Sequence, residues 1–287
     1  MPETSGFLLI DKAAGISSFD VIRRLRQITG TRKIGHTGTL DPFATGLLIC
    51  ALGSCTRLCQ FLEAQSKSYS AVLKLGEKTS TGDTEGEIIE RSDLIPGRLP
   101  EDNLAQAVLD LSELPTPKFS AVKVNGKPAY EYARQGIELE LANRPVQISS
   151  FELRSYDPPN LSYACRVSKG TYIRSLGEFI AGFLGTVGHS TSLRRTSIGP
   201  VDVGEALQLD ELTPATFADH FYPAAKLFSG YEQLIPSAEL LSALRNGQSC
   251  EQSGEDREQV ILVEKSGRVL GVARRAGGRL YPSINLH

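Results

Sequence analysis

The chain has 287 residues, and its 31 Lys and Arg against 33 Asp and Glu give a formal net charge of −2 at pH 7. Apolar residues make up 40% of the composition, enough for a substantial core, and no apolar run is long enough to predict a membrane span. Residues 1–5 lack the pattern of a signal peptide, and the five cysteines form no Cys-x-x-Cys pair. We therefore expect a cytoplasmic protein with reduced thiols, built as one large and one small domain.

Charge is unevenly distributed along the sequence. Between residues 77 and 113 acids outnumber bases ten to three, whereas bases dominate at 21–40, 115–130, 194–195 and from 265 onward. Such segregation can give a nearly neutral protein a basic face, which favours a polyanionic partner. A solvated surface is the simpler interpretation of any single cluster, but four clusters together favour a nucleic acid.

The first half of the chain predicts a mixture of strands and helices. Residues 6–11 are typical of a short buried strand, and a helix capped by Ser17 or Ser18 ends at Gly30. The apolar residues of this helix recur every three positions, at Phe19, Ile22, Leu25 and Ile28. The elements that follow are an apolar run at 47–52, a helix at 56–63, a half-buried strand at 69–75, a loop at 79–86 and an amphipathic helix at 104–111.

The second half opens with an excursion over 115–144, where a strand at 119–124 enters a tight turn at Asn125-Gly126 and a helix at 130–135 ends at Gly136. Alternation over 161–167 predicts a strand that delivers residues 168–174 to a helix at 175–183. After a helix at 236–245, short strands at 260–263 and 269–273 indicate a small β-rich module. Because strands and helices do not alternate as βαβ units, we expect an α+β fold with domains at 1–228, including the excursion, and 229–287.

The most informative segment is the loop Gly35-His36-Thr37-Gly38-Thr39-Leu40-Asp41-Pro42-Phe43-Ala44-Thr45-Gly46. It presents one carboxylate, Asp41, among glycines and hydroxyls, and Pro42 biases that aspartate away from helical angles. Five basic residues precede the loop, and no acid lies between Asp20 and Asp41. A turn or cap aspartate is the alternative interpretation, but an acid at the end of a basic approach favours a substrate held by its phosphates.

Four further residues are candidates for the same site. Arg174, where a strand gives way to a helix, is placed to pair with a carboxylate and keep it ionised, although taken alone a surface arginine at a helix start explains it better. Tyr69 and Tyr172 offer flat faces for a base withdrawn from its stack, although strand tyrosines commonly belong to the core. His36 is a candidate acid–base group or stacking partner.

The sequence lacks the motifs of several common kinds of active site. The four histidines share no metal-ligand spacing and no cysteine pair accompanies them, so we expect no metal site. The Gly-x-Ser-x-Gly elbow of a serine hydrolase is absent, and the segment 30–37 lacks the spacing of a nucleotide P-loop. A phosphate-ester hydrolase built on the glycine loop would need a metal cluster that the sequence does not contain.

Taken together, these segments resemble the bacterial tRNA pseudouridine-55 synthases of the TruB family over most of the chain. The matching segments are GFLLIDKAAGISSFDVIRRLR, GHTGTLDPFATGLL, KSYSAVLKLGEKTSTGDTEGE, PKFSAVKVNGKPAYEYARQG, VSKGTYIRSLG and SLRRTSIGP. The opening segment has Ala13 after the lysine where the family usually has proline, and the tail is a weak match to the family's RNA-binding PUA domain. Six motifs in one order are far more specific than a lone glycine pattern.

The resemblance implies roles for these residues. Asp41 corresponds to the catalytic aspartate, Arg174 to the arginine that orients it, and Tyr69 to the active-site tyrosine; Tyr172 packs near the base and His36 helps to hold the opened loop. The other residues that the resemblance assigns to substrate binding are Lys67, Lys169, Leu193 and, in the RNA-gripping insertion 115–144, Lys118, Lys123 and Lys127.

The resemblance also implies a fold and a reaction. The fold is a mixed sheet with flanking helices and a PUA-like C-terminal domain. The reaction isomerises uridine 55 of the tRNA T-arm loop to pseudouridine after the base flips out, with no cofactor and no metal, and Asp41 either attacks the nucleotide or removes a ribose proton. The expected partner is tRNA, with no DNA or membrane, and the expected state is a monomer. A non-catalytic tRNA chaperone and a synthase for another RNA are the alternatives.

Overall fold

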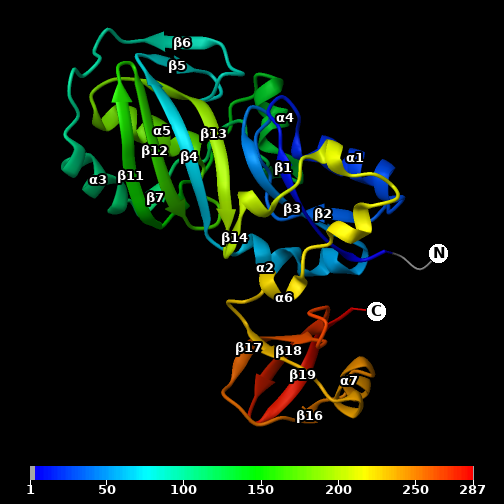
Figure 1. The fold of residues 1–287 in the computed structure, drawn as a ribbon. Coiled ribbons are helices and arrows are strands. Elements are labelled where there is room, and N and C mark those ends of the chain that lie inside the picture. The colour runs from blue at the N-terminus through cyan, green and yellow to red at the C-terminus, as the bar shows by residue number, and fades with distance from the viewer. Residues whose placement is uncertain (1–3, 287) are drawn as a thin grey trace. The chain divides into compact units, whose positions relative to one another are not determined.

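The computed structural model describes residues 4–286, and the fold is α+β, the predicted class (Figure 1). The chain divides into two compact units. The first unit comprises Met1–Leu40, Gly46–Glu63 and Ser197–His287, and the second comprises Asp41–Thr45 and Ala64–Thr196. None of the described helices is long and apolar enough to cross a membrane.

The first unit is built around two antiparallel strands, β1 (Gly6–Lys12) and β3 (Thr45–Leu52). β2 (Ile34–His36) pairs with the other edge of β3. Alternate residues of β1 enter two separate cores, Phe7 and Leu9 into one and Leu8 and Ile10 into the other. A strand buried on both faces reads as a continuous apolar run, which is why residues 6–11 were recognisable as a strand.

Helix α1 (Ser18–Thr29) packs on this core and begins and ends where predicted. The Ser17 hydroxyl accepts a hydrogen bond from the Asp20 amide in a capping box, and Gly30 ends the helix with φ 66°. Phe19 differs from the other members of the period-three series, because its side chain is 58% exposed. A strict period of three drifts by about 60° per step, so Phe19 and Ile28 lie about 180° apart around the helix.

Short elements complete this part of the first unit. They are the 3₁₀ turn at Gly53–Leu58, α2 (Cys59–Glu63), β14 (Val201–Asp202), the 3₁₀ turns at Val203–Glu205, Leu209–Glu211 and Phe217–His220, and α6 (Ala224–Leu227).

Residues from 229 onward, which we call the C-terminal module, form a five-stranded sheet of order β15-β17-β18-β19-β16 with helix α7 beside it (Figure 1). Some side chains of this sheet, including Ile261 and Val272, belong to the same core as Phe7 and Leu9. Val260 and Leu262 pack instead with residues of α7. The elements are β15 (Glu232–Leu234), α7 (Ala238–Arg245), β16 (Cys250–Glu251), β17 (Arg257–Val263), β18 (Val269–Ala276) and β19 (Arg279–Asn285).

The second unit contains a sheet of order β13-β4-β12-β11. β4 and β12 pair antiparallel, so that Tyr69 lies directly opposite Cys165. The strands are β4 (Lys67–Leu75), β11 (Ile148–Asp157), β12 (Asn160–Val167) and β13 (Gly188–Ile198), and α5 (Ile173–Phe183) follows β12 after a short turn. The remaining elements are β5 (Glu77–Thr79), β6 (Ile88–Arg91) and α3 (Glu101–Leu109).

The predicted insertion leaves the second unit between two short paired strands, β7 (Glu113–Leu114) and β10 (Arg144–Pro145). Its hairpin is shorter than predicted, because only β8 (Lys123–Val124) and β9 (Lys127–Pro128) pair. Asn125 and Gly126 form the turn with φ 51° and 83°, and α4 (Ala129–Arg134) follows. The strand predicted over 119–122 is wrong, since the Phe119 carbonyl accepts a hydrogen bond from Arg174 instead of a strand partner.

Candidate active site

Asp41 lies in a tight turn between β2 and β3. The Ala44 amide donates a hydrogen bond to the Asp41 carbonyl at 3.1 Å, with Pro42 in the second position of the turn, which the fixed φ of proline suits. Gly38 and Gly46 on either side have φ of 120° and 105°. This backbone leaves the Asp41 side chain 31% exposed, so its carboxylate is open to solvent while the neighbouring chain is held in place.

The guanidinium of Arg174 contacts the Asp41 carboxylate at two points. Nη2 donates to Oδ1 at 3.1 Å, and Nε lies 2.9 Å from Oδ2 in an ion-pair contact that is not aligned as a hydrogen bond. Arg174 comes from the first turn of α5, and its side chain is only 4% exposed. The interpretation of Arg174 as a surface arginine is therefore wrong. A buried guanidinium keeps a fixed direction, so it orients the carboxylate as well as attracting it.

The other donors of Arg174 reach two further segments of the second unit. Nη1 donates to the Thr81 carbonyl at 2.7 Å and lies 3.4 Å from Oδ2 of Asp83, while Nη2 also donates to the Phe119 carbonyl at 2.8 Å. The Asp83 carboxylate is 3% exposed and accepts hydrogen bonds from the Thr81 hydroxyl and the Glu85 amide. Two acidic side chains and two carbonyls thus surround one buried cation and compensate its loss of hydration.

Tyr69 lies on β4, only 8% exposed, close enough to Asp41 for the carboxylate to act on its hydroxyl. Burial raises the pKa of Tyr69 above its ordinary value. The guanidinium of Arg195 on β13, which is 1% exposed, opposes this shift, first through its positive charge and then through hydrogen bonding to the Tyr69 side chain. The hydroxyl therefore stays protonated at neutral pH, with a buried cation next to its oxygen.

The other predicted residues of the second unit fall into two groups. Tyr172 is the residue before α5, two positions from Arg174, and Leu193 is 5% exposed on β13, two positions from Arg195. Lys67 is also buried, and its ammonium donates to the Gln65 carbonyl at 2.9 Å. The exposed lysines are Lys118, paired with Glu138 at 3.0 Å, Lys123 and Lys127 on the hairpin, and Lys169 in the turn after β12.

His36 belongs to the first unit, as the last residue of β2. The Gly38 amide donates to its Nδ1 at 3.3 Å, so this nitrogen is an acceptor and the proton of a neutral ring is on Nε2. The ring is half-buried. This hydrogen bond holds the imidazole against the glycine segment that leads to Asp41.

The root of the insertion is attached to α5. Ser175 donates to the Pro115 carbonyl at 2.8 Å, next to the contact of Arg174 with Phe119. Thr116 donates to the Ala142 carbonyl at 2.8 Å and so closes the insertion at its base. A cavity of about 500 Å³ lies between the insertion, the 78–81 segment and α5, with Arg174 and Phe119 in its lining.

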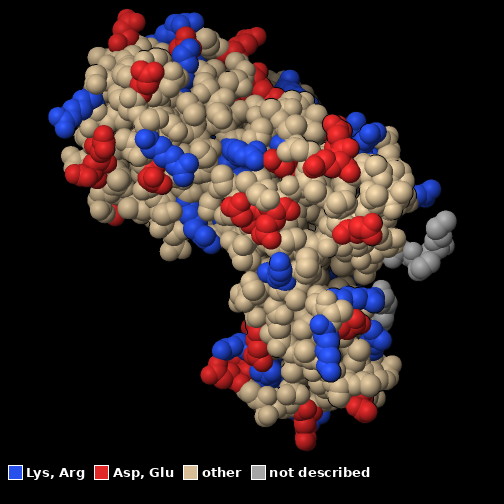
Figure 2. Space-filling model, in the orientation of Figure 1, with Lys and Arg blue, Asp and Glu red and all other residues tan. Residues whose placement is uncertain are grey.

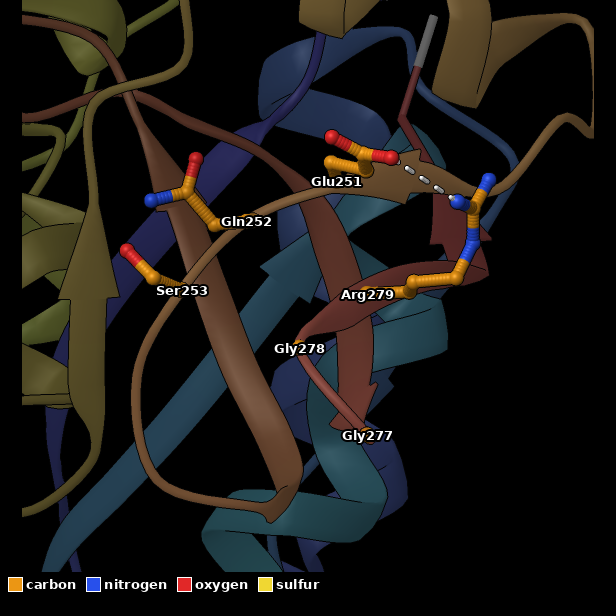
Figure 3. Close-up of a pocket in the computed structure, with 6 residues that line it drawn as sticks. All are labelled: Glu251, Gln252, Ser253, Gly277, Gly278 and Arg279. Carbon is orange, nitrogen blue, oxygen red and sulfur yellow. Dashed lines mark ion pairs between the residues drawn. The ribbon is translucent and has the colours of Figure 1, made fainter.

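The C-terminal module has an open hollow of about 600 Å³ (Figure 3). The Gly277-Gly278 turn forms one side, and the chain at 251–253 forms the other. Glu251 and Arg279 face each other across it at 3.8 Å. Arg279 also donates to the Ser249 carbonyl at 3.0 Å. The lining is polar, so this hollow suits a hydrophilic ligand better than an apolar one.

Comparison with known proteins identifies the family of this chain. Residues 26–173, which contain Asp41, Tyr69 and the turn before Arg174, match the TruB family pseudouridylate synthase N-terminal domain. The chain belongs to the TruB family. The family predicted from the sequence motifs is therefore confirmed.

Relatives of this TruB-family chain match along nearly its whole length. It is 37% identical over 288 residues to tRNA pseudouridine synthase B of Burkholderia mallei (strain NCTC 10247), covering 96% of this chain and 95% of the relative. It is 38% identical to tRNA pseudouridine synthase B of Leifsonia xyli subsp. xyli (strain CTCB07), covering 98% and 96%. Over 212 residues it is 42% identical to the protein of that name from Syntrophotalea carbinolica (strain DSM 2380 / NBRC 103641 / GraBd1), covering 72% and 68%.

Two solved structures share the fold. The archaeal box H/ACA sRNP Nop10–Cbf5 complex contains a chain that matches with a TM-score of 0.69 and 20% identity, covering 98% of this chain and 85% of that one. An H/ACA RNP bound to a substrate RNA containing 2′-deoxyuridine matches with a TM-score of 0.67 and 19% identity, covering 98% and 84%. At these identities the likeness concerns the fold alone.

Two buried residues that interact with the candidate site escaped the sequence-based prediction. Asp83 stood in an acidic loop that looked like a solvated surface, and Arg195 was one of a basic pair. Both are buried against predicted site residues. The available signal for Arg195 was its place in SLRRTSIGP, two residues after Leu193, where alternation along a strand puts both side chains on one face.

Proposed function

We propose that this TruB-family protein isomerises uridine 55 in the T-arm loop of tRNA to pseudouridine. The observation that carries the proposal is the partly exposed Asp41 carboxylate, held by a buried Arg174 and next to a buried tyrosine. The names of the relatives, tRNA pseudouridine synthase B, support tRNA as the substrate. The reaction breaks the C1′–N1 bond, rotates the uracil, joins C1′ to C5 and moves the C5 proton to solvent while N1 gains one, so it needs no redox cofactor.

The chemistry starts from a flipped uridine, because neither C1′ nor C5 is accessible within a base stack. Of the two carboxylates that Arg174 contacts, Asp41 is 31% exposed and Asp83 is 3% exposed, so Asp41 is the one that meets the nucleotide. Two routes then lead to cleavage: the carboxylate attacks the nucleotide, or it removes a ribose proton. In both routes Arg174 keeps the carboxylate ionised and fixes its direction, since removing a buried cation from a carboxylate favours the protonated form.

Tyr69 is proposed to stack on the flipped base and to take part in removing the C5 proton. The aromatic ring of a tyrosine supplies a flat apolar face for such stacking. Tyr172 and Leu193 pack near the base, and His36 holds the opened RNA loop. With these assignments, loss of Tyr69 should reduce the rate of pseudouridine formation more than it reduces tRNA affinity.

RNA binding outside the site is assigned to basic side chains. Figure 2 shows acidic and basic side chains interspersed over the face in view, so attraction to phosphates depends on local groups of lysines and arginines. Within the insertion 115–144 these are Lys118, Lys123 and Lys127, whereas Lys67 and Lys169 of the catalytic domain 1–228 are assigned to substrate binding. We assign the C-terminal module, 229–287, to RNA contact as a PUA-like domain, with the hollow at Arg279 as its polar surface. The proposed active form is a cytoplasmic monomer.

The test uses an unmodified tRNA transcript tritiated at C5 of its uridines. Wild-type protein should release tritium without added metal, and mapping should place pseudouridine at position 55. Asp41→Asn should abolish release while the Kd for tRNA stays within a few-fold of wild type. Asp110→Asn, the same chemical change at an exposed site after α3, serves as the matched control and should behave as wild type.

The outcomes separate the alternatives. Release from another uridine would support pseudouridine synthase activity but would refute uridine 55 as the modified position. Tight tRNA binding without release would favour a chaperone. Normal turnover by Asp41→Asn would refute the assigned mechanism.

A further inference from the structure

Phe19 is an exposed aromatic residue on an otherwise regular amphipathic helix. Its side chain is 58% exposed, whereas Val21, Ile22, Leu25 and Ile28 of the same helix α1 are buried. The polar face of a helix gains nothing from a solvated phenyl ring, so the residue has no role in the core of the first unit. The ring is nevertheless held in a defined setting, because α1 begins at a capping box only two residues earlier.

Two guanidinium groups lie against this ring. Arg23 and Arg26 each place Cζ 5.8 Å from the centroid of Phe19, at one and two helical turns along the exposed face. Asp20 fixes Arg23 through an ion pair of 2.6 Å, and the side chain of Arg23 remains 62% exposed. More than half of the aromatic surface stays open beside two cations.

Apart from Asp20, which pairs with Arg23, the charged residues from 18 to 40 are all basic. Arg24, Arg32 and Lys33 are also exposed, and the sequence has no acid between Asp20 and Asp41. An aromatic face combined with guanidinium groups matches an unpaired nucleobase and its flanking phosphates, because the base stacks on the ring and the cations neutralise the backbone. A protein partner would offer acidic side chains to the arginines, but it would have no equivalent need for the flat open ring.

We propose that Phe19, Arg23 and Arg26 form a second RNA-binding element, which stacks an unpaired base of the tRNA and contacts the phosphates beside it. That its RNA is tRNA rests on the proposed function, but none of its residues belongs to the Asp41 site. It adds affinity, and its loss is measured as a weaker Kd for tRNA.

Three substitutions of Phe19 distinguish stacking from simple apolar contact. Phe19→Ala should weaken tRNA binding about thirtyfold, the middle of the range found when a stacking aromatic is truncated. Phe19→Leu keeps an apolar side chain but no flat face, so it should bind as weakly as alanine, whereas Phe19→Trp should restore wild-type affinity. Because the residue is exposed and alanine favours helices, the melting temperature should not fall.

The arginines are tested by salt dependence. Replacing Arg23 and Arg26 together by glutamine should reduce the slope of log Kd against log salt concentration by about 1.5, as expected for two lost phosphate contacts. Phe183→Ala is the matched control, since Phe183 is a 41% exposed phenylalanine on α5 with no Lys or Arg from Ser175 to Leu193. It should leave both Kd and salt slope unchanged.

Binding by Phe19→Ala or Phe19→Leu with wild-type affinity would overturn this proposal, and so would an unchanged salt slope in the double arginine variant. Pseudouridine formation is measured separately on the wild-type protein. If wild type binds tRNA but forms no pseudouridine, the proposed function fails, whereas the comparison of Phe19 variants retains its meaning. If wild type binds no tRNA, both proposals fail.

Discussion

Removing the Arg174 guanidinium should lower the folding stability of the second unit even when no substrate is present. Arg174→Met leaves the Asp83 carboxylate, 3% exposed, without the cation that lies 3.4 Å away. The carbonyls of Thr81 and Phe119 lose charged donors at 2.7 and 2.8 Å. The Asp41 contact adds little to stability, because that carboxylate is 31% exposed and is screened by water.

The expected cost follows from these contacts. Breaking a buried ion pair by removing one partner typically costs about 3–5 kcal/mol. Asp83 keeps its hydrogen bonds from the Thr81 hydroxyl and the Glu85 amide, which offset part of the penalty, so we expect about 3 kcal/mol for Arg174→Met. Asp83→Asn removes the unpaired charge, so adding it to Arg174→Met should recover about 1–2 kcal/mol.

The assay is a double-mutant cycle in urea. The chain contains no tryptophan, so unfolding is followed by far-ultraviolet circular dichroism, and the four proteins are compared by their midpoints at equal m-values. A loss below about 1 kcal/mol in Arg174→Met would refute the reasoning, because it would mean that the buried carboxylate does not depend on this cation. Strictly additive effects of the two substitutions would refute it as well.

Two further predictions concern other buried groups. Arg195→Met should raise the pKa of Tyr69 further, because it removes the guanidinium that opposes the effect of burial, and tritium release should fall more than tRNA affinity does; equal losses in a rate assay and a binding assay would contradict this. Burial raises the pKa of three thiols to about 11 or 12, so iodoacetamide at pH 8 should leave them unmodified in the native protein and react first at Cys250, with alkylation of the others rising only as pH approaches those values. Peptide mapping would identify the sites; the protected thiols are Cys55, Cys59 and Cys165.

Local signals in the sequence predicted local structure well. Helix α1 has a capping serine at one end and a glycine in left-handed conformation at the other, and both are properties of adjacent residues. The alternating burial of β4 follows the alternation of its side chains. Asn125-Gly126 formed the predicted turn because those two residues tolerate positive φ.

Long-range contacts were not readable in this way. β13 is a strand of eleven residues rich in Ser, Thr and Arg, and no apolar alternation marks it; its buried arginine is stabilised by partners on other strands. Arg174 and Asp41 are 133 residues apart, and Arg174 and Thr81 are 93 apart. Family resemblance brought Asp41 and Arg174 together, because a motif carries three-dimensional information that composition lacks. It did not reveal Asp83, which stood among many acids.

The arrangement around Arg174 has a consequence for how the site responds to RNA. One guanidinium binds the turn at Asp41, the loop at Thr81 and Asp83, and the root of the insertion at Phe119. Nη2 is shared between the Asp41 carboxylate and the Phe119 carbonyl. Any displacement of the insertion at Phe119 therefore changes the donors available to Asp41, because a nitrogen released by the carbonyl can serve the carboxylate alone. The insertion, proposed to bind RNA, and Asp41, proposed to start the reaction, are thus coupled through the buried side chain of Arg174.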